Sequence, residues 1–118
     1  MHDPPADWRD VGPVADLPLN EPVGVVVALG ATAELKLALI RREEGVCAVL
    51  DRCPHRGAPF SDLGLVDDEG HLVCGWHYWA FRLSDGEHAH VPGVRLACFP
   101  VRVNAGRVEV DVSKRALG

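Results

Sequence analysis

Two short segments, each with one cysteine and one histidine, most constrain how this chain of 118 residues can fold. The first, at residues 53–55, reads Cys-Pro-His, and the second, at residues 74–77, reads Cys-Gly-Trp-His. Consecutive residues of a strand point to opposite faces, so paired side chains this close in sequence must lie on tight loops. Proline and glycine occur in or just after both segments, and these residue types form turns. The sequence therefore predicts two turn-rich loops that each present one cysteine and one histidine.

The rest of the chain has the pattern of an all-β fold. Short runs rich in Val, Leu and Ile are separated by turn residues, which is typical of a small antiparallel sandwich or barrel. We expect strands at residues 23–29, 35–41, 46–50, 71–74, 80–83, 99–103 and 107–112. The Asn-Ala-Gly sequence at residues 104–106 predicts a hairpin turn, because Asn and Gly tolerate positive φ. Residues 62–66 could form one helical turn.

The composition indicates a single globular domain. Hydrophobic residues make up 47% of the chain and charged residues 25%, close to the average for soluble domains. We expect a loose N-terminal segment at residues 1–7, one domain at residues 8–112 and a C-terminal tail at residues 113–118. A chain of this length buries a core without disulfides, which leaves its four cysteines for another use.

Charge and hydropathy exclude some partners and compartments. The net charge of -5 repels nucleic-acid phosphates, so we expect no nucleic-acid partner. The longest uncharged apolar stretch, residues 23–33, is much shorter than the roughly 20 residues that cross a bilayer, so we expect no membrane span. The first residues lack the basic and apolar regions of a secretory signal. We therefore expect a cytoplasmic protein with reduced cysteines.

Three interpretations are open for Cys53, His55, Cys74 and His77 from their residue types. Tetrahedral zinc accepts both ligand types, but structural zinc sites usually separate two ligands by two to four residues in each half. A cluster of two irons and two sulfides fits better, because each segment then gives one ligand to each iron. Ordinary core residues are the third interpretation, although four such ligands rarely coincide in two turn-rich loops. The residues favour iron and sulfide.

The chain resembles the Rieske family over most of its length. Both Cys/His segments carry the resemblance, and further matches are Trp-Arg-Asp-Val at 8–11, Phe-Arg-Leu-Ser-Asp-Gly at 81–86 and Phe-Pro-Val-Arg-Val at 99–103. It implies a Rieske fold in which loops at about residues 51–60 and 74–80 form a cluster-binding subdomain. It further implies a [2Fe-2S] cluster whose buried iron is held by Cys53 and Cys74. By the same resemblance, His55 and His77 hold the outer iron, near solvent.

Within that family the sequence is most similar to Rieske-type ferredoxins. The respiratory members carry an extra cysteine in each cluster loop, whereas Cys47 and Cys98 lie outside both loops and are expected to be small buried hydrophobes. Trp76 and Tyr78 are expected to shield the cluster, together with a third loop at residues 91–93.

Two positions depart from the family pattern. The family usually has Gly directly after the second histidine, where this chain has Tyr78. The next residue, Trp79, lacks the hydroxyl that hydrogen-bonds a cluster sulfur in high-potential members. This predicts a reduction potential in the low part of the Rieske range of about -150 to +300 mV.

The implied function is one-electron transfer, and the chain is not expected to be an enzyme by itself. An oxygenase needs a second iron site made of two histidines and a carboxylate, which the remaining histidines do not provide; His88 and His90 are expected to face solvent. No Gly-x-Gly-x-x-Gly segment for a nicotinamide or flavin cofactor is present. The leading interpretation is a carrier between a flavin-dependent reductase and a terminal oxygenase, such as a ring-hydroxylating dioxygenase. Alternatives are the small Rieske-like subunit of an assimilatory nitrite reductase and a non-redox zinc-binding interaction module.

Overall fold

The computed structural model describes residues 5–54, 57–76 and 78–113, and this part of the chain is almost entirely β structure. Its helical elements are the 3-10 turn η1 (Val14–Asp16) and the short helix α1 (Phe60–Leu63). The strands are β1 (Trp8–Pro13), β2 (Pro22–Ala28), β3 (Glu34–Arg42), β4 (Gly45–Leu50), β5 (Gly64–Val66), β6 (His71–Cys74), β7 (Ala80–Arg82), β8 (Cys98–Phe99), β9 (Val101–Asn104) and β10 (Arg107–Asp111).

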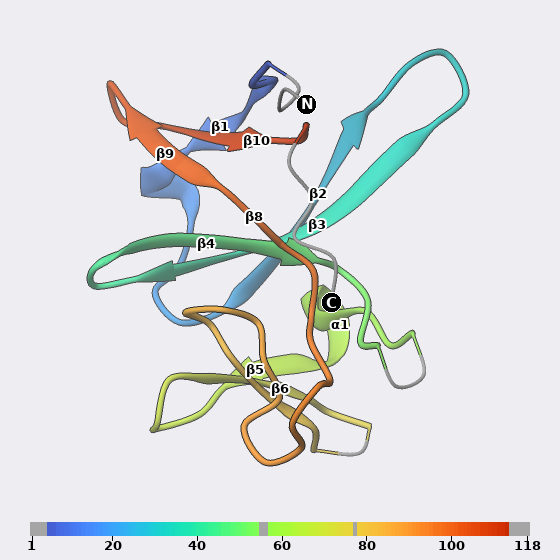
Figure 1. Cartoon of the computed structure of the whole chain (residues 1–118). Helices are drawn as coiled ribbons and strands as arrows, with labels where there is room; N and C mark the ends of the chain where they lie inside the picture. Colours follow the sequence, from blue (N-terminus) through green and yellow to red (C-terminus); the bar gives the residue numbers. More distant parts are fainter. Residues whose placement is uncertain (1–4, 55–56, 77, 114–118) are drawn as a thin grey trace.

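The strands form three antiparallel sheets, as the sequence pattern predicts. Their orders are β1-β10-β9, β2-β3-β4-β8 and β5-β6-β7. The third sheet is built from the segment between β4 and β8, and this segment forms the lower part of the molecule in Figure 1. The two predicted cysteine loops belong to this inserted segment, so the all-β frame and the candidate site occupy separate parts of the fold.

Side chains of β3 contribute to two different cores because they alternate between the two faces of the middle sheet. Leu37 and Leu39 belong to one core, shared with β10. Ala38 and Ile40 belong to the other, shared with α1 and the third sheet. All four are at most 1% exposed. Both faces of the middle sheet are therefore covered, and the second core connects it to the inserted segment.

Some predicted elements differ from the observed ones. The strand expected at residues 99–103 is split at Pro100, which has no N–H to donate to a ladder. Residues 62–66 are not one helical turn, because α1 ends at Leu63 and β5 begins at Gly64. The hairpin turn between β9 and β10 is confirmed, with Ala105 and Gly106 at positive φ of 52° and 76°.

Neither helix in the described ranges is both long and apolar enough to cross a membrane.

Candidate metal centre

The first cysteine loop is closed by two backbone hydrogen bonds around Cys53. The N–H of Cys53 donates to the carbonyl oxygen of Ala58 at 2.8 Å, and the N–H of Gly57 donates to the carbonyl oxygen of Cys53 at 2.8 Å. Gly57 has a φ of 78°, in the left-handed region that glycine adopts without a steric penalty. The turn predicted from proline and glycine is therefore present, with Cys53 at its base.

The second cysteine loop repeats this hydrogen-bond pattern residue for residue. The N–H of Cys74 donates to the carbonyl oxygen of Trp79, and the N–H of Tyr78 donates to the carbonyl oxygen of Cys74, both at 2.8 Å. Tyr78 thus occupies the position of Gly57 in the first loop, with a φ of 59°. For a residue with a Cβ this conformation costs about 1 kcal/mol or more.

Cys53 and Cys74 are buried in the same core. Cys53 is 1% exposed and Cys74 is 3% exposed, and both belong to the core that includes Phe60 and Phe81. The two phenylalanine rings meet edge to face, with their centroids 6.1 Å apart. Thiolates are soft ligands, which zinc and iron–sulfur clusters prefer. Two sulfur atoms enclosed by apolar and aromatic side chains therefore fit a centre of this kind.

Helix α1 connects the two loops. It follows the first loop directly, and a Cβ at Gly75 in the second loop would collide with the carbonyl oxygen of Leu63, the last residue of α1. The second loop therefore packs on the backbone at the end of α1. This contact explains why a residue without a side chain follows Cys74.

The two predicted histidine ligands, His55 and His77, lie outside the described residues. Among the residues that are described, no group of three or more His, Cys, Asp or Glu side chains could hold a metal ion. The structure thus brings Cys53 and Cys74 into one buried core, and the complete ligand set remains a prediction.

His88 is buried, and the prediction that it faces solvent is wrong. It is 8% exposed, and its ring lies edge to face against Trp79 and Phe81, at centroid distances of 5.0 and 5.3 Å. Its Nδ1 accepts hydrogen bonds from the N–H groups of His90 and Val91, at 3.0 and 3.1 Å. Burial, assisted by the nearby His90, lowers the pKa of His88.

His88 therefore fixes the start of the predicted third loop on the aromatic residues behind the second cysteine loop. No sequence pattern indicated this, because His88 acts through backbone groups that the fold brings to it. His90 is exposed, as predicted.

The aromatic residues of the second loop do not share one environment. Trp76 is 52% exposed and Tyr78 is 78% exposed, so both rings extend largely into solvent. Trp79 is the ring that packs inward, against Phe81 and His88. The expectation that Trp76 and Tyr78 shield the cluster stays a prediction, and the ring that packs inward in the structure is that of Trp79.

Cys47 and Cys98 are half-buried, and so more exposed than the small buried hydrophobes that the sequence predicts. The Cys47 Sγ lies 3.8 Å from the carbonyl oxygen of Leu83, and the Cys98 Sγ lies 3.5 Å from that of Leu96. Burial raises the pKa of both thiols. These cysteines are therefore protonated thiols that pack against backbone, away from the two loops.

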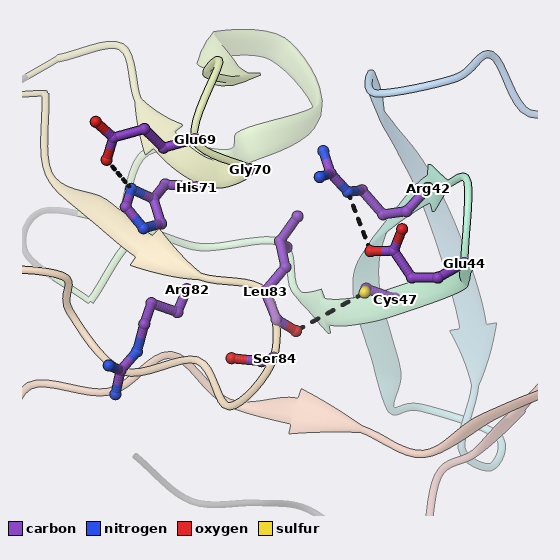
Figure 2. Close-up of a pocket in the computed structure, with 9 residues that line it drawn as sticks. All are labelled: Arg42, Glu44, Cys47, Glu69, Gly70, His71, Arg82, Leu83 and Ser84. Carbon is purple, nitrogen blue, oxygen red and sulfur yellow. Dashed lines mark hydrogen bonds and ion pairs between the residues drawn. The ribbon is translucent and has the colours of Figure 1, made fainter.

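A surface pocket of about 530 Å³ lies beside β3, β4, β6 and β7, and Figure 2 shows the side chains that line it. Polar side chains that line it lie in pairs: Arg42 Nε is 3.7 Å from Glu44 Oε1, and His71 Nδ1 is 3.7 Å from Glu69 Oε2. None of its lining residues comes from residues 53–58 or 74–79. The pocket is separate from the candidate metal centre.

Comparison with known proteins identifies the family of this arrangement. The sequence model of the Rieske [2Fe-2S] domain matches residues 7–100, which include both cysteine loops. The chain belongs to the Rieske [2Fe-2S] domain family. The cofactor of this domain is a Rieske-type [2Fe-2S] cluster, and the buried thiols of Cys53 and Cys74 fit its sulfur-ligated iron.

Solved structures of the same Rieske fold cover nearly the whole chain. One is a putative NADH-dependent nitrite reductase small subunit from Mycobacterium tuberculosis, 28% identical, with a TM-score of 0.79 and coverage of 98% of this chain and 99% of that chain. Another is a chain in the complex of reduced oxygenase and oxidized ferredoxin in carbazole 1,9a-dioxygenase, 30% identical. It gives a TM-score of 0.76 and covers 94% of this chain and 97% of that chain.

Curated Rieske relatives include much longer proteins. The vanillate O-demethylase oxygenase subunit of Pseudomonas sp. (strain HR199 / DSM 7063) is 47% identical over 66 residues, which are 55% of this chain. The match spans only 18% of the length of that relative. The similarity to this oxygenase subunit is therefore confined to a small part of it.

Proposed function

We propose that this chain is a one-electron carrier whose [2Fe-2S] cluster is held by Cys53, His55, Cys74 and His77. The observation that carries the proposal is the pair of loops closed by the same hydrogen bonds, with one buried cysteine at the base of each. Two sulfur ligands from such loops and two histidines complete the Rieske ligand set. We place this function in one domain at residues 8–112.

The protein supplies the surroundings that one-electron transfer requires. A Rieske cluster, when bound, changes by one electron between its two states. Cys53 and Cys74 would hold it from inside the apolar core, where both side chains are almost inaccessible to water. The loops themselves lie at the surface, with Trp76 and Tyr78 exposed, so a second protein can approach closely.

We propose a flavin-dependent reductase as electron donor and a terminal oxygenase as acceptor, both in the cytoplasm. Support comes from the similarity to a chain in the complex of an oxygenase with its ferredoxin, of which this chain covers 97%. The match to the oxygenase subunit of vanillate O-demethylase covers 18% of that protein, so it supports a shared Rieske part and not a shared oxygenase activity.

The small Rieske-like subunit of an assimilatory nitrite reductase is the second candidate. The similarity to the putative nitrite reductase small subunit, which extends over 99% of that chain, favours it. Both candidates use the same site and differ in the partner. A non-redox zinc module is the third candidate. Metal and acid-labile sulfide analysis of the purified protein, described next, excludes or establishes it.

Analysis of the purified protein tests the cluster. We expect two irons and two acid-labile sulfides per chain, and a dithionite-reduced electron paramagnetic resonance spectrum whose mean g value lies below that of all-cysteine clusters. Cys53→Ser and Cys74→Ser should each abolish this spectrum. A colourless wild-type protein with zinc and no sulfide would refute electron transfer.

Reconstitution tests the partner. The reduced carrier is mixed in turn with a terminal oxygenase and with the large flavin- and sirohaem-containing subunit of a nitrite reductase. Turnover with the oxygenase from a freely dissociating carrier supports the first candidate. A stable complex with the large subunit supports the second.

A further inference from the structure

The residue that follows the second predicted histidine ligand has an unfavourable backbone conformation. Tyr78 and Gly57 make the same hydrogen bond in their loops, and both have positive φ, 59° and 78°. Glycine meets this requirement without strain, whereas tyrosine does not. A glycine at position 78 would therefore build the same loop at lower free energy.

Packing of the Tyr78 side chain does not compensate for this strain. The ring is 78% exposed, and within the described parts of the chain it makes no hydrogen bond or ring contact. The inward position of the loop is taken by Trp79, which packs on Phe81 and His88. Tyr78 thus adds strain to the folded protein and little packing.

Tyr78 is also part of an exposed aromatic surface. Trp76, two residues earlier in the same loop, is 52% exposed, so two exposed rings come directly before and after residue 77 in the sequence. The loop from Cys74 to Trp79 carries no Asp, Glu, Lys or Arg, although the chain has a net charge of -5. Exposed tryptophan and tyrosine rings in a segment that itself carries no charged residue are typical of the centre of protein contact surfaces.

We propose that Trp76 and Tyr78 form the contact surface for the redox partner protein, and that Tyr78 is a specificity-determining residue for it. This inference rests on the proposed function, because electron transfer requires a partner at the loop that holds the cluster. The occupant is a protein with an uncharged, apolar surface, matching the uncharged loop. Two rings provide a small contact, as expected of transient electron-transfer complexes, which bury little area.

The central experiment compares the wild-type protein with Tyr78→Gly. The variant should unfold at the same or a higher temperature, and its iron content, paramagnetic spectrum and reduction potential should be unchanged. Its KM should rise at least fivefold in reduction by the flavoprotein reductase, with NADH as donor and cytochrome c as final acceptor, while kcat stays within twofold. Tyr78→Phe, which keeps the ring, should retain the wild-type KM.

Ala105→Gly provides the matched control. Ala105 has a positive φ of 52° in the hairpin between β9 and β10, so this change relieves a similar strain without touching an aromatic ring. It should likewise unfold at the same or a higher temperature and leave KM unchanged. The comparison separates the loss of the ring from the gain in backbone freedom.

Two results overturn the inference without affecting the proposed function. One is a wild-type KM in Tyr78→Gly, and the other is a loss of cluster from that variant, which would make Tyr78 structural. The reductase is first chosen by testing flavoproteins of dioxygenase systems and of nitrite reductases with the wild-type carrier. A wild-type protein that lacks the Rieske spectrum, or that none of these reduces, refutes both the inference and the proposed function.

Discussion

Ser61 donates two hydrogen bonds to the carboxylate of Asp51. Its N–H lies 2.8 Å from Asp51 Oδ1, and its Oγ lies 2.5 Å from Asp51 Oδ2. Asp51 precedes the first cysteine loop and Ser61 lies in helix α1 just after it, so the pair joins both ends of the segment that contains Cys53. The Asp51 N–H in turn donates to the carbonyl oxygen of Lys36 in β3, which anchors the loop to the middle sheet.

Asp51→Ala should weaken cluster binding more than it lowers the stability of the β-sheets. It removes two hydrogen bonds to a charged acceptor, which together contribute about 3 kcal/mol in a part-buried setting. We expect less iron per chain and faster loss of visible absorbance in urea. The matched control is Asp62→Ala, since Asp62 is exposed on the same helix. Equal cluster loss in both variants would contradict a positioning role for Asp51.

The main strands could be predicted from sequence because their own residues determine them. The runs of Val, Leu and Ile in β2, β3 and β4 indicate strands whichever other strands they pair with. Strand β1 was not predicted, because its residues do not alternate and its partner β10 lies at the other end of the sequence. Pairing across such a separation depends on the assembled fold.

The same distinction applies to the candidate site. The positions of Cys53 and Cys74 at the base of tight loops follow from neighbouring turn residues. The roles of Asp51, His88 and Trp79 do not, because each acts on groups that lie elsewhere in the sequence. Their environments result from packing, which a local pattern does not encode.

Gly75→Ala should prevent correct closure of the second cysteine loop. The added Cβ would collide with the carbonyl oxygen of Leu63, a backbone atom that cannot rotate away. Overpacking of this kind typically costs about 1 to 3 kcal/mol, and we expect iron content to fall with stability. Gly106→Ala is the control, because φ there is 76° but no atom lies within 4 Å of the added Cβ. It should lower the unfolding temperature and leave iron content unchanged.

The double variant Cys47→Ser, Cys98→Ser should retain the cluster. Both thiols lie near backbone carbonyl oxygens, to which a serine hydroxyl can also donate. Because burial raises the pKa of both thiols, they should also react slowly with iodoacetamide in the native wild-type protein. The iron and acid-labile sulfide content of the double variant checks the first statement. Alkylation of the wild type, measured by mass spectrometry, checks the second. Loss of iron and acid-labile sulfide from a double variant that still folds would assign a ligand role to one of these cysteines.

His88 should make stability depend on pH in the mildly acidic range. The ordinary pKa of a histidine is about 6.5, and burial with the neighbouring His90 lowers it in the folded protein. The unfolded chain therefore binds more protons than the folded chain just below pH 6.5, so stability falls as the pH decreases through this window. Protonated Nδ1 can no longer accept from the N–H groups of His90 and Val91. Urea unfolding between pH 7.5 and 5 measures the effect.

His88→Asn tests this assignment. An asparagine side-chain oxygen can accept from backbone N–H groups two or three residues further on, but it does not titrate. The variant should be less stable than the wild type at pH 7.5, because it lacks the ring contacts with Trp79 and Phe81. It should lose less stability than the wild type between pH 6.5 and 5. Parallel pH profiles for the two proteins would show that another group causes the acid sensitivity.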